Sequence, residues 1–279
     1  MDFRPRIHVL SQQPASAKAP DLSFEGLLRH FPGLREAESV SFTGSFAAGW
    51  ANPMSDIDIY AFSDTELTLP VDETMETWRA SDRSGVVWSS WIGRYDDVRI
   101  DIKVWPTDAL DTVLRPFLDA EPEFSNVSPA VEDFLYRVSI AKPLTDPAFV
   151  ERMKTTLVNS SYARALARWA KAMTENCLTD VAGQLAAGDA LGARLSAMNA
   201  AAHIADACLI MSGQLSRGRK WLLRRIEDTP DCGITTSEYC SVVLGGQLEG
   251  ETQAQTALRV ARWAQSHHIR IEDRVLSAH

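Results

Sequence analysis

The stretch of residues 40–60 constrains the fold more than any other part of the chain. A short apolar segment, residues 40–43, is followed by Gly44-Ser45, and a second apolar segment, residues 57–60, carries acids. This pattern predicts a strand, a tight turn that opens a helical turn, and a second strand. Residues two apart on a strand share a face, so Asp56 and Asp58 are expected to point the same way. The intervening isoleucines are expected to point into a core.

The residue types in this stretch indicate a particular chemistry. Two carboxylates side by side on an apolar strand repel each other and require a cation, and Mg²⁺ prefers such oxygen ligands. Gly44 allows a tight turn, after which backbone N–H groups and the Ser45 hydroxyl can hold phosphate oxygens, helped by a helix N-terminus. The stretch therefore predicts binding of a metal–triphosphate and transfer of a phosphoryl group. The alternative is a solvated acidic strand, which leaves Gly44-Ser45 unexplained.

A hydrophobic residue, Gly-Ser, ten residues, and then Asp-hydrophobic-Asp-hydrophobic resembles the nucleotidyltransferase superfamily of DNA polymerase beta and the aminoglycoside and lincosamide nucleotidyltransferases. The resemblance implies an enzyme of the EC 2.7.7 type that depends on Mg²⁺. Such an enzyme moves a nucleoside monophosphate, here expected to be AMP from ATP, onto a hydroxyl of a small molecule and releases pyrophosphate. An antibiotic or natural product would be a typical acceptor. The motif positions are Thr43, Gly44, Ser45, Asp56 and Asp58.

A third carboxylate lies in a second alternating segment. Residues 98–105 place apolar side chains on one face and Asp101 on the other, with Arg99 and Lys103 beside it. The resemblance implies that Asp101 either completes the metal site or serves as general base for the acceptor hydroxyl. The alternative is an exposed strand residue that pairs with Arg99 or Lys103. The predicted catalytic and metal-binding residues are Asp56, Asp58 and Asp101.

A cationic segment, residues 216–226, is the second region of interest. It predicts a helix on which Arg217, Lys220 and Arg224 share one face. The resemblance implies that Lys220 contacts the triphosphate, where a cation stabilises the charge of the leaving pyrophosphate. The alternative is a solvated basic helix that pairs with Glu227 and Asp228. The residues predicted to bind nucleotide are Thr43, Gly44, Ser45, Ser55, Arg217, Arg219 and Lys220.

The chain is expected to hold an α+β nucleotidyltransferase domain with a mixed sheet, followed by an all-α helical bundle. We predict a mobile N-terminal lead-in over residues 1–20, the catalytic domain over 21–145 and the helical domain over 146–279. Residues 64–82 are expected to form a loop and a helix around Met75 and Trp78. Glycines at 183, 188 and 213 are expected to break the helices of the second domain.

Composition excludes several classes of protein. The 279 residues are 45% hydrophobic and 23% charged, which is typical of a soluble globular protein. The net charge of −9 argues against a nucleic-acid partner. The sequence contains no run of 18 apolar residues, so we expect no membrane span. Because the N-terminal stretch lacks the apolar segment of a signal peptide, we expect a cytoplasmic protein.

The partners expected are therefore a nucleoside triphosphate and a small-molecule acceptor. The sequence leaves open a monomer or a homodimer. It also leaves open an alternative function, in which the chain is an antitoxin-like module or a scaffold of nucleotidyltransferase fold that acts on or binds a protein partner.

Overall fold

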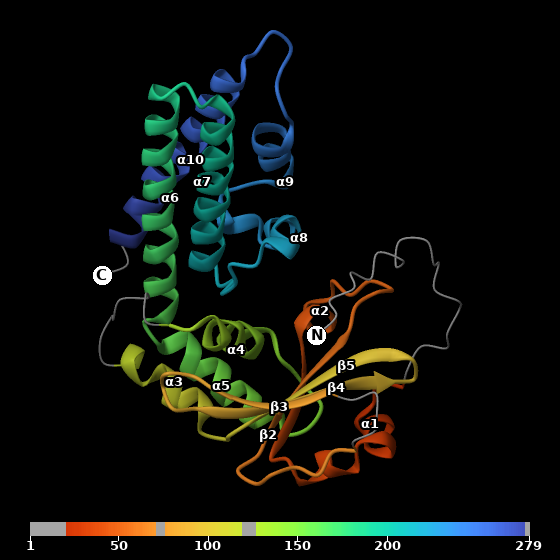
Figure 1. Ribbon diagram of the computed structural model, residues 1–279. Helices are drawn as coiled ribbons and strands as arrows, with labels where there is room; N and C mark the ends of the chain where they lie inside the picture. The colour runs from red at the N-terminus through yellow and green to blue at the C-terminus, as the bar shows by residue number, and fades with distance from the viewer. Residues whose placement is uncertain (1–20, 71–75, 119–126, 277–279) are drawn as a thin grey trace. The chain divides into compact units, whose positions relative to one another are not determined.

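The computed structural model describes residues 21–70, 76–118 and 127–276. The predicted lead-in, residues 1–20, lies outside these ranges. The mixed sheet and the helices that the sequence predicts are both present (Figure 1). The chain divides into two compact units whose segments alternate along the sequence. The first unit runs to Ala109 and includes Ile140–Arg152. The second unit comprises Leu110–Ser139 and the chain from Met153. This division differs from the single boundary expected at residue 145, because residues 110–139 group with the later helices.

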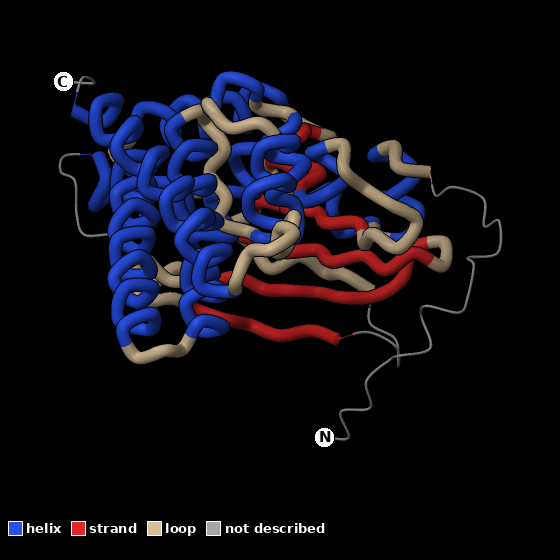
Figure 2. Tube along the Cα trace, turned by 90° about the horizontal axis from the view of Figure 1, so that it is seen from above, coloured by secondary structure: helices blue, strands red, loops and turns tan. Residues whose placement is uncertain are grey.

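The strands of the described residues form one sheet in the order β3-β4-β5-β2-β1-β6, and they lie side by side in Figure 2. The central pair, β2 and β5, is parallel, and every other neighbouring pair is antiparallel. The strand bounds are β1 Ser39–Thr43, β2 Ile57–Phe62, β3 Glu76–Ser81, β4 Val87–Tyr95, β5 Val98–Trp105 and β6 Lys142–Pro143.

One face of the sheet packs against the first two helical elements, α1 (Phe24–His30) and η2 (Pro32–Glu36). The isoleucines of β2, Ile57 and Ile59, are fully buried in this core. The prediction that they point into a core is confirmed. The helix α1 begins where the Ser23 side chain accepts a hydrogen bond from the backbone of Gly26, which satisfies one of the free N–H groups at the helix start.

The opposite face of the sheet carries a second layer of aromatic side chains. Trp88 of β4 stacks on Trp105 of β5, with ring centroids 4.8 Å apart. Phe62 of β2 contacts Phe149 of α5 (Pro147–Asn159), with ring centroids 5.2 Å apart. Because both faces are covered, the β2 side chains are buried along the whole strand. Asp58 therefore lies on a strand that water reaches poorly.

The helix expected around Trp78 is wrong, because Glu76–Ser81 forms β3, the edge strand that pairs with β4. Most residues of β3 are exposed. Met75 lies outside the described residues. The pairing of β3 with β4 supplies the backbone hydrogen bonds that the local sequence does not specify.

The second unit contains three long helices. The helix α6 packs along α7, and α10 packs on both (Figure 1). Gly188, with φ of 79°, lies in the turn between α6 and α7, and Gly213, with φ of 92°, follows α7. The break expected at Gly183 is wrong, because α6 continues through it. The helices of this unit are α3 Ala109–Leu118, α4 Pro129–Ile140, α6 Tyr162–Ala186, α7 Ala190–Met211, η4 Arg219–Trp221, α8 Leu222–Glu227, η5 Pro230–Cys232, α9 Thr236–Tyr239, η6 Cys240–Leu244 and α10 Gln253–Leu276.

Within the described ranges, no helix combines the length and the hydropathy needed to traverse a lipid bilayer.

Candidate nucleotide and metal site

The sheet brings two of the three predicted acids into register. Asp58 of β2 is the cross-strand partner of Asp101 of β5, and Thr43 of β1 is the partner of Asp58 on its other side. Neighbouring strands lie about 4.8 Å apart and residues in register share a face, so the two carboxylates stand side by side. Asp58 is 7% exposed, and Asp101 is half-buried. The parallel pairing of β2 with β5 is what unites them.

The third acid lies just before β2. A turn closes there, in which the backbone N–H of Asn52 donates to Ser55 Oγ at 2.9 Å and the backbone N–H of Ser55 donates to the Asn52 carbonyl at 2.8 Å. The Asp56 carboxylate then lies 3.9 Å from the Arg99 guanidinium, with both side chains partly exposed. Ser55 thus shapes the entry to β2, and its predicted contact with nucleotide stays a prediction.

The oxygen donors of this region suit Mg²⁺, which proteins commonly hold by one or two carboxylates together with phosphates of the substrate. Asp58 and Asp101 provide such a pair. Across the part of the chain that the structure describes, no group of three or more His, Cys, Asp or Glu side chains is gathered closely enough to hold a metal ion. The metal-binding roles of Asp56, Asp58 and Asp101 stay predictions.

The turn after β1 has the backbone that the Gly-Ser pair implies. Gly44 has φ of 63°, a left-handed conformation that glycine adopts without strain. It begins α2 (Gly44–Ala48), which has only five residues, so the expected help from a helix dipole is small. Ser45 is 8% exposed, and Thr43 is fully buried. The turn offers backbone N–H groups and one hydroxyl, and the binding of phosphate by them stays a prediction.

A residue that sequence reasoning missed contacts Asp101. The Ser90 hydroxyl of β4 donates a hydrogen bond to Asp101 Oδ1 at 3.2 Å. The signal in the sequence is weak: Ser90 stands between Trp88 and Ile92 in the row of alternate residues on one face of β4. A polar residue in an otherwise apolar row indicates a polar partner on the neighbouring strand.

The cationic segment of the second unit differs from its prediction. Residues 216–218 are not helical, and the helical backbone begins with η4 at Arg219 and continues in α8 from Leu222. Arg217 therefore does not share a helix face with Lys220 and Arg224, and the predicted helix is wrong at its start.

Two of the three predicted nucleotide-binding cations, Arg217 and Arg219, form ion pairs with carboxylates of the protein. Arg217 forms an ion pair with Glu132 of α4, and its guanidinium lies 3.7 Å from the ring centroid of Trp169. Arg219 lies 2.7 Å from an oxygen of Asp206 and 3.2 Å from Nδ1 of His203. Burial and the nearby Arg219 and Arg217 lower the pKa of His203 to about 4, so its imidazole is neutral at pH 7.

Asp206 is the centre of this cation cluster. It is fully buried in α7 and also accepts a hydrogen bond from Arg225 at 3.0 Å. Arg225 is itself fully buried and donates to the carbonyls of Gln214 and Ser216. Burial raises the pKa of the Asp206 carboxyl, and the two arginines oppose that rise. A single aspartate in an alanine-rich helix was the available signal, since a buried acid requires a cation.

Lys220 differs from its arginine neighbours. Its side chain is exposed, and Nζ lies 5.1 Å from the ring centroid of Trp221. Its contact with a triphosphate stays a prediction.

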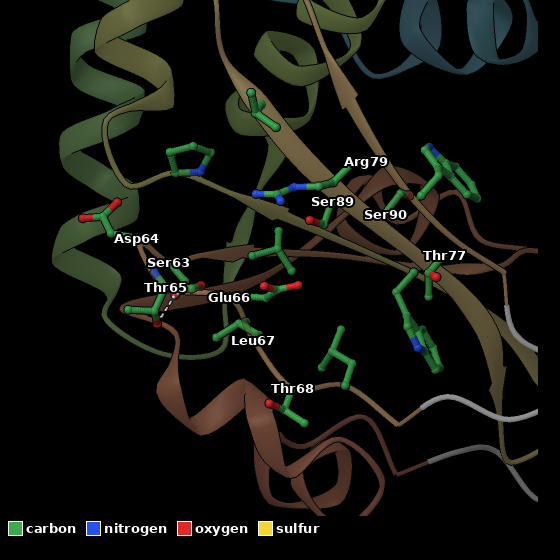
Figure 3. A pocket seen from close by; sticks show the side chains of 16 residues that line it. Ser63, Asp64, Thr65, Glu66, Leu67, Thr68, Thr77, Arg79, Ser89 and Ser90 are labelled. Carbon is green, nitrogen blue, oxygen red and sulfur yellow. Dashed lines mark hydrogen bonds between the residues drawn. The ribbon is translucent and has the colours of Figure 1, made fainter.

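The sheet unit also contains a groove of about 780 Å³ between residues 63–69 and strands β3 to β5. Figure 3 shows Glu66 and Arg79 projecting toward its middle. The wall residues Trp91 and Val104 lie on the sheet face that carries the isoleucine core, opposite the face of Asp101. Ser90 also lines the groove, whereas Asp58 and Asp101 are not among its lining residues.

No protein-family model matches the chain, and no curated protein sequence matches it. Among solved structures, the chain is similar to a nucleotidyltransferase-like protein from Exiguobacterium sibiricum 255-15, with 12% identity and a TM-score of 0.45 over 84% of this chain and 69% of that one. We therefore base the functional proposal on the residues of this chain.

Proposed function

We propose that the protein is a nucleotidyltransferase that moves AMP from ATP onto a hydroxyl of a small molecule, such as an antibiotic or natural product, and releases pyrophosphate. The observation that carries the proposal is the pairing of Asp58 with Asp101 in register on adjacent parallel strands. Two carboxylates on one buried face repel each other, and a divalent cation removes that cost. The glycine turn at Gly44, next to Asp58 through the β1–β2 pairing, supports the same reading.

The roles of the residues follow from their chemistry. Asp58 and Asp101 would hold Mg²⁺, which when bound would supply positive charge to neutralise the charge that develops on the phosphates. The Ser45 hydroxyl and the N–H groups of the turn would orient the terminal phosphates. Asp101, the more accessible of the paired acids, would alternatively accept the proton of the acceptor hydroxyl. Because positioning and charge neutralisation carry phosphoryl transfer, loss of either acid removes most of the rate.

The testing experiment compares two changes of acid to amide in the sheet unit. Binding of ATP, GTP, CTP and UTP with Mg²⁺ is measured by calorimetry for the wild type, Asp58→Asn and Glu66→Gln. Glu66 lies in the groove on the other face of the sheet, so its variant controls for loss of one negative charge. We expect Mg²⁺-dependent binding of one nucleotide that Asp58→Asn abolishes and Glu66→Gln retains.

Transfer is then measured with the nucleotide that binds, labelled at its α-phosphate, and a panel of hydroxyl-bearing small molecules. Label on an acceptor, with an equal amount of pyrophosphate, supports the proposal. An Asp58→Asn protein with full turnover would contradict it. Nucleotide binding without transfer to any small molecule, together with label on a protein partner, would favour the antitoxin-like or scaffold alternative.

A further inference from the structure

Ser90 is a buried polar residue with one defined partner. Its side chain is 1% exposed, and its hydroxyl donates to Asp101 Oδ1 at 3.2 Å. Its neighbours on the same face of β4, Trp88 and Ile92, are apolar. A hydroxyl placed among such residues costs free energy unless it is hydrogen-bonded, and Asp101 provides the acceptor.

The sheet fixes the two ends of this hydrogen bond rigidly. β4 and β5 form a continuous antiparallel ladder from Ser89 to Tyr95, so Ser90 and Asp101 cannot move apart independently. The stacked rings of Trp88 and Trp105 connect the same two strands next to it. A donor on a rigid strand holds a carboxylate in one orientation, which a solvated acid does not keep.

We infer that Ser90 is a positioning residue that orients the Asp101 carboxylate for a divalent cation shared with Asp58. The inference rests on the proposed function, because it gives Asp101 a metal-binding role. Ser90 makes no contact with the cation itself; it holds Oδ1 of Asp101 from the second strand. Groups that orient a metal-binding carboxylate in this way typically contribute 10- to 100-fold in metal affinity or activity.

The test is Mn²⁺ binding to the full-length protein, counted as loss of the free-ion signal in electron paramagnetic resonance. Wild type is compared with Ser90→Ala, Ser90→Thr and Ser89→Ala. Ser89 is adjacent in the chain but alternates to the other face of β4. Both serines line the groove (Figure 3), but it is Ser90 that donates to Asp101. The threonine variant keeps the hydroxyl on a side chain that strands accommodate.

We expect Ser90→Ala to weaken Mn²⁺ binding 10- to 100-fold, Ser90→Thr to restore it to within a few-fold, and Ser89→Ala to leave it unchanged. Equal affinity for wild type and Ser90→Ala would overturn the inference. So would equal weakening in all three variants, because that indicates a general effect on the sheet. Thermal melting of each variant identifies loss of folding.

This readout separates the inference from the proposed function. Mn²⁺ binding that depends on the Ser90 hydroxyl, in a protein that transfers no nucleotide, would support the positioning role and refute the enzyme activity. A wild-type protein that binds no Mn²⁺ with or without ATP would overturn the positioning role, since Asp101 would then have no cation to bind.

Discussion

Replacement of Asp206 by asparagine tests whether the buried ion cluster of the helical unit is required for its stability. Asp206 is fully buried and accepts hydrogen bonds from Arg219 at 2.7 Å and from Arg225 at 3.0 Å. Asp206→Asn keeps the shape of the side chain and one acceptor oxygen but removes the negative charge. The side chain of Arg219 is 42% exposed, so water can replace its partner. Arg225 is buried and would keep an uncompensated charge.

Breaking a buried pair by removing one partner costs about 3 to 5 kcal/mol. Because the amide oxygen and the carbonyls of Gln214 and Ser216 still accept from Arg225, we expect the lower end, about 3 kcal/mol. If the free energy of unfolding falls with urea at an m-value of about 2 kcal/mol/M, this loss lowers the urea concentration at the unfolding midpoint by about 1.5 M.

The assay is urea unfolding followed by circular dichroism at 222 nm, which reports on the helices. The matched control is Glu227→Gln, which makes the same chemical change in the exposed pair of Arg224 with Glu227, whose side chains are 63% and 60% exposed. That variant should cost about 0 to 1 kcal/mol. An Asp206→Asn protein within 0.5 kcal/mol of the control would refute the reasoning that burial makes this cluster costly to break.

Three further predictions concern single residues. Lys220→Ala should leave the unfolding midpoint unchanged, since the side chain is exposed. If the lysine contacts phosphate, the same change should lower nucleotide transfer at least tenfold in steady-state assays. Unchanged transfer would show that Lys220 is not part of the site. The pKa of His203 is about 4 in the folded protein and 6.5 in the unfolded chain, so the unfolded state binds more protons between these values. Stability should therefore be complete above about pH 6.5 and fall toward pH 4, by about 1 to 2 kcal/mol after allowing for partial exposure, and His203→Gln should flatten this pH dependence in thermal melts. Gly183→Ala should stabilise α6 by about 0.5 to 1 kcal/mol, because an added Cβ meets no atom within 4 Å. Gly188→Ala should instead destabilise the turn by about 1 to 2 kcal/mol, because Gly188 has a φ of 79°. Equal effects of the two changes on the free energy of unfolding would contradict this account.

The local pattern of the sequence was sufficient for most individual elements. Alternation over residues 98–105 predicted β5, which has these same bounds. The apolar residues on either side of Gly44 predicted β1 and β2. These features depend on neighbours within a few positions, which a sequence displays directly.

Two local predictions failed because tertiary partners decided them. Residues 216–218 were predicted to begin a helix, but Gly218 is a poor helix former, and Arg217 pairs with Glu132 and contacts Trp169 instead. Residues 76–81 lack a strong strand pattern, yet they pair with the open edge of β4. The partners of Arg217 lie far away in the chain, whereas β4 follows β3 after a short turn. In both cases helix or strand propensity is too weak to compete with the pairing.

The sequence by itself identified the acids, placed Asp58 and Asp101 on strands and located the glycine turn. Only the tertiary structure decided that Asp58 and Asp101 stand in register, that Ser90 donates to one of them, and that Asp206 binds two arginines. The physical reason is that strand pairing and burial depend on contacts between distant segments, and a shift of one residue in register would turn a side chain to the other face.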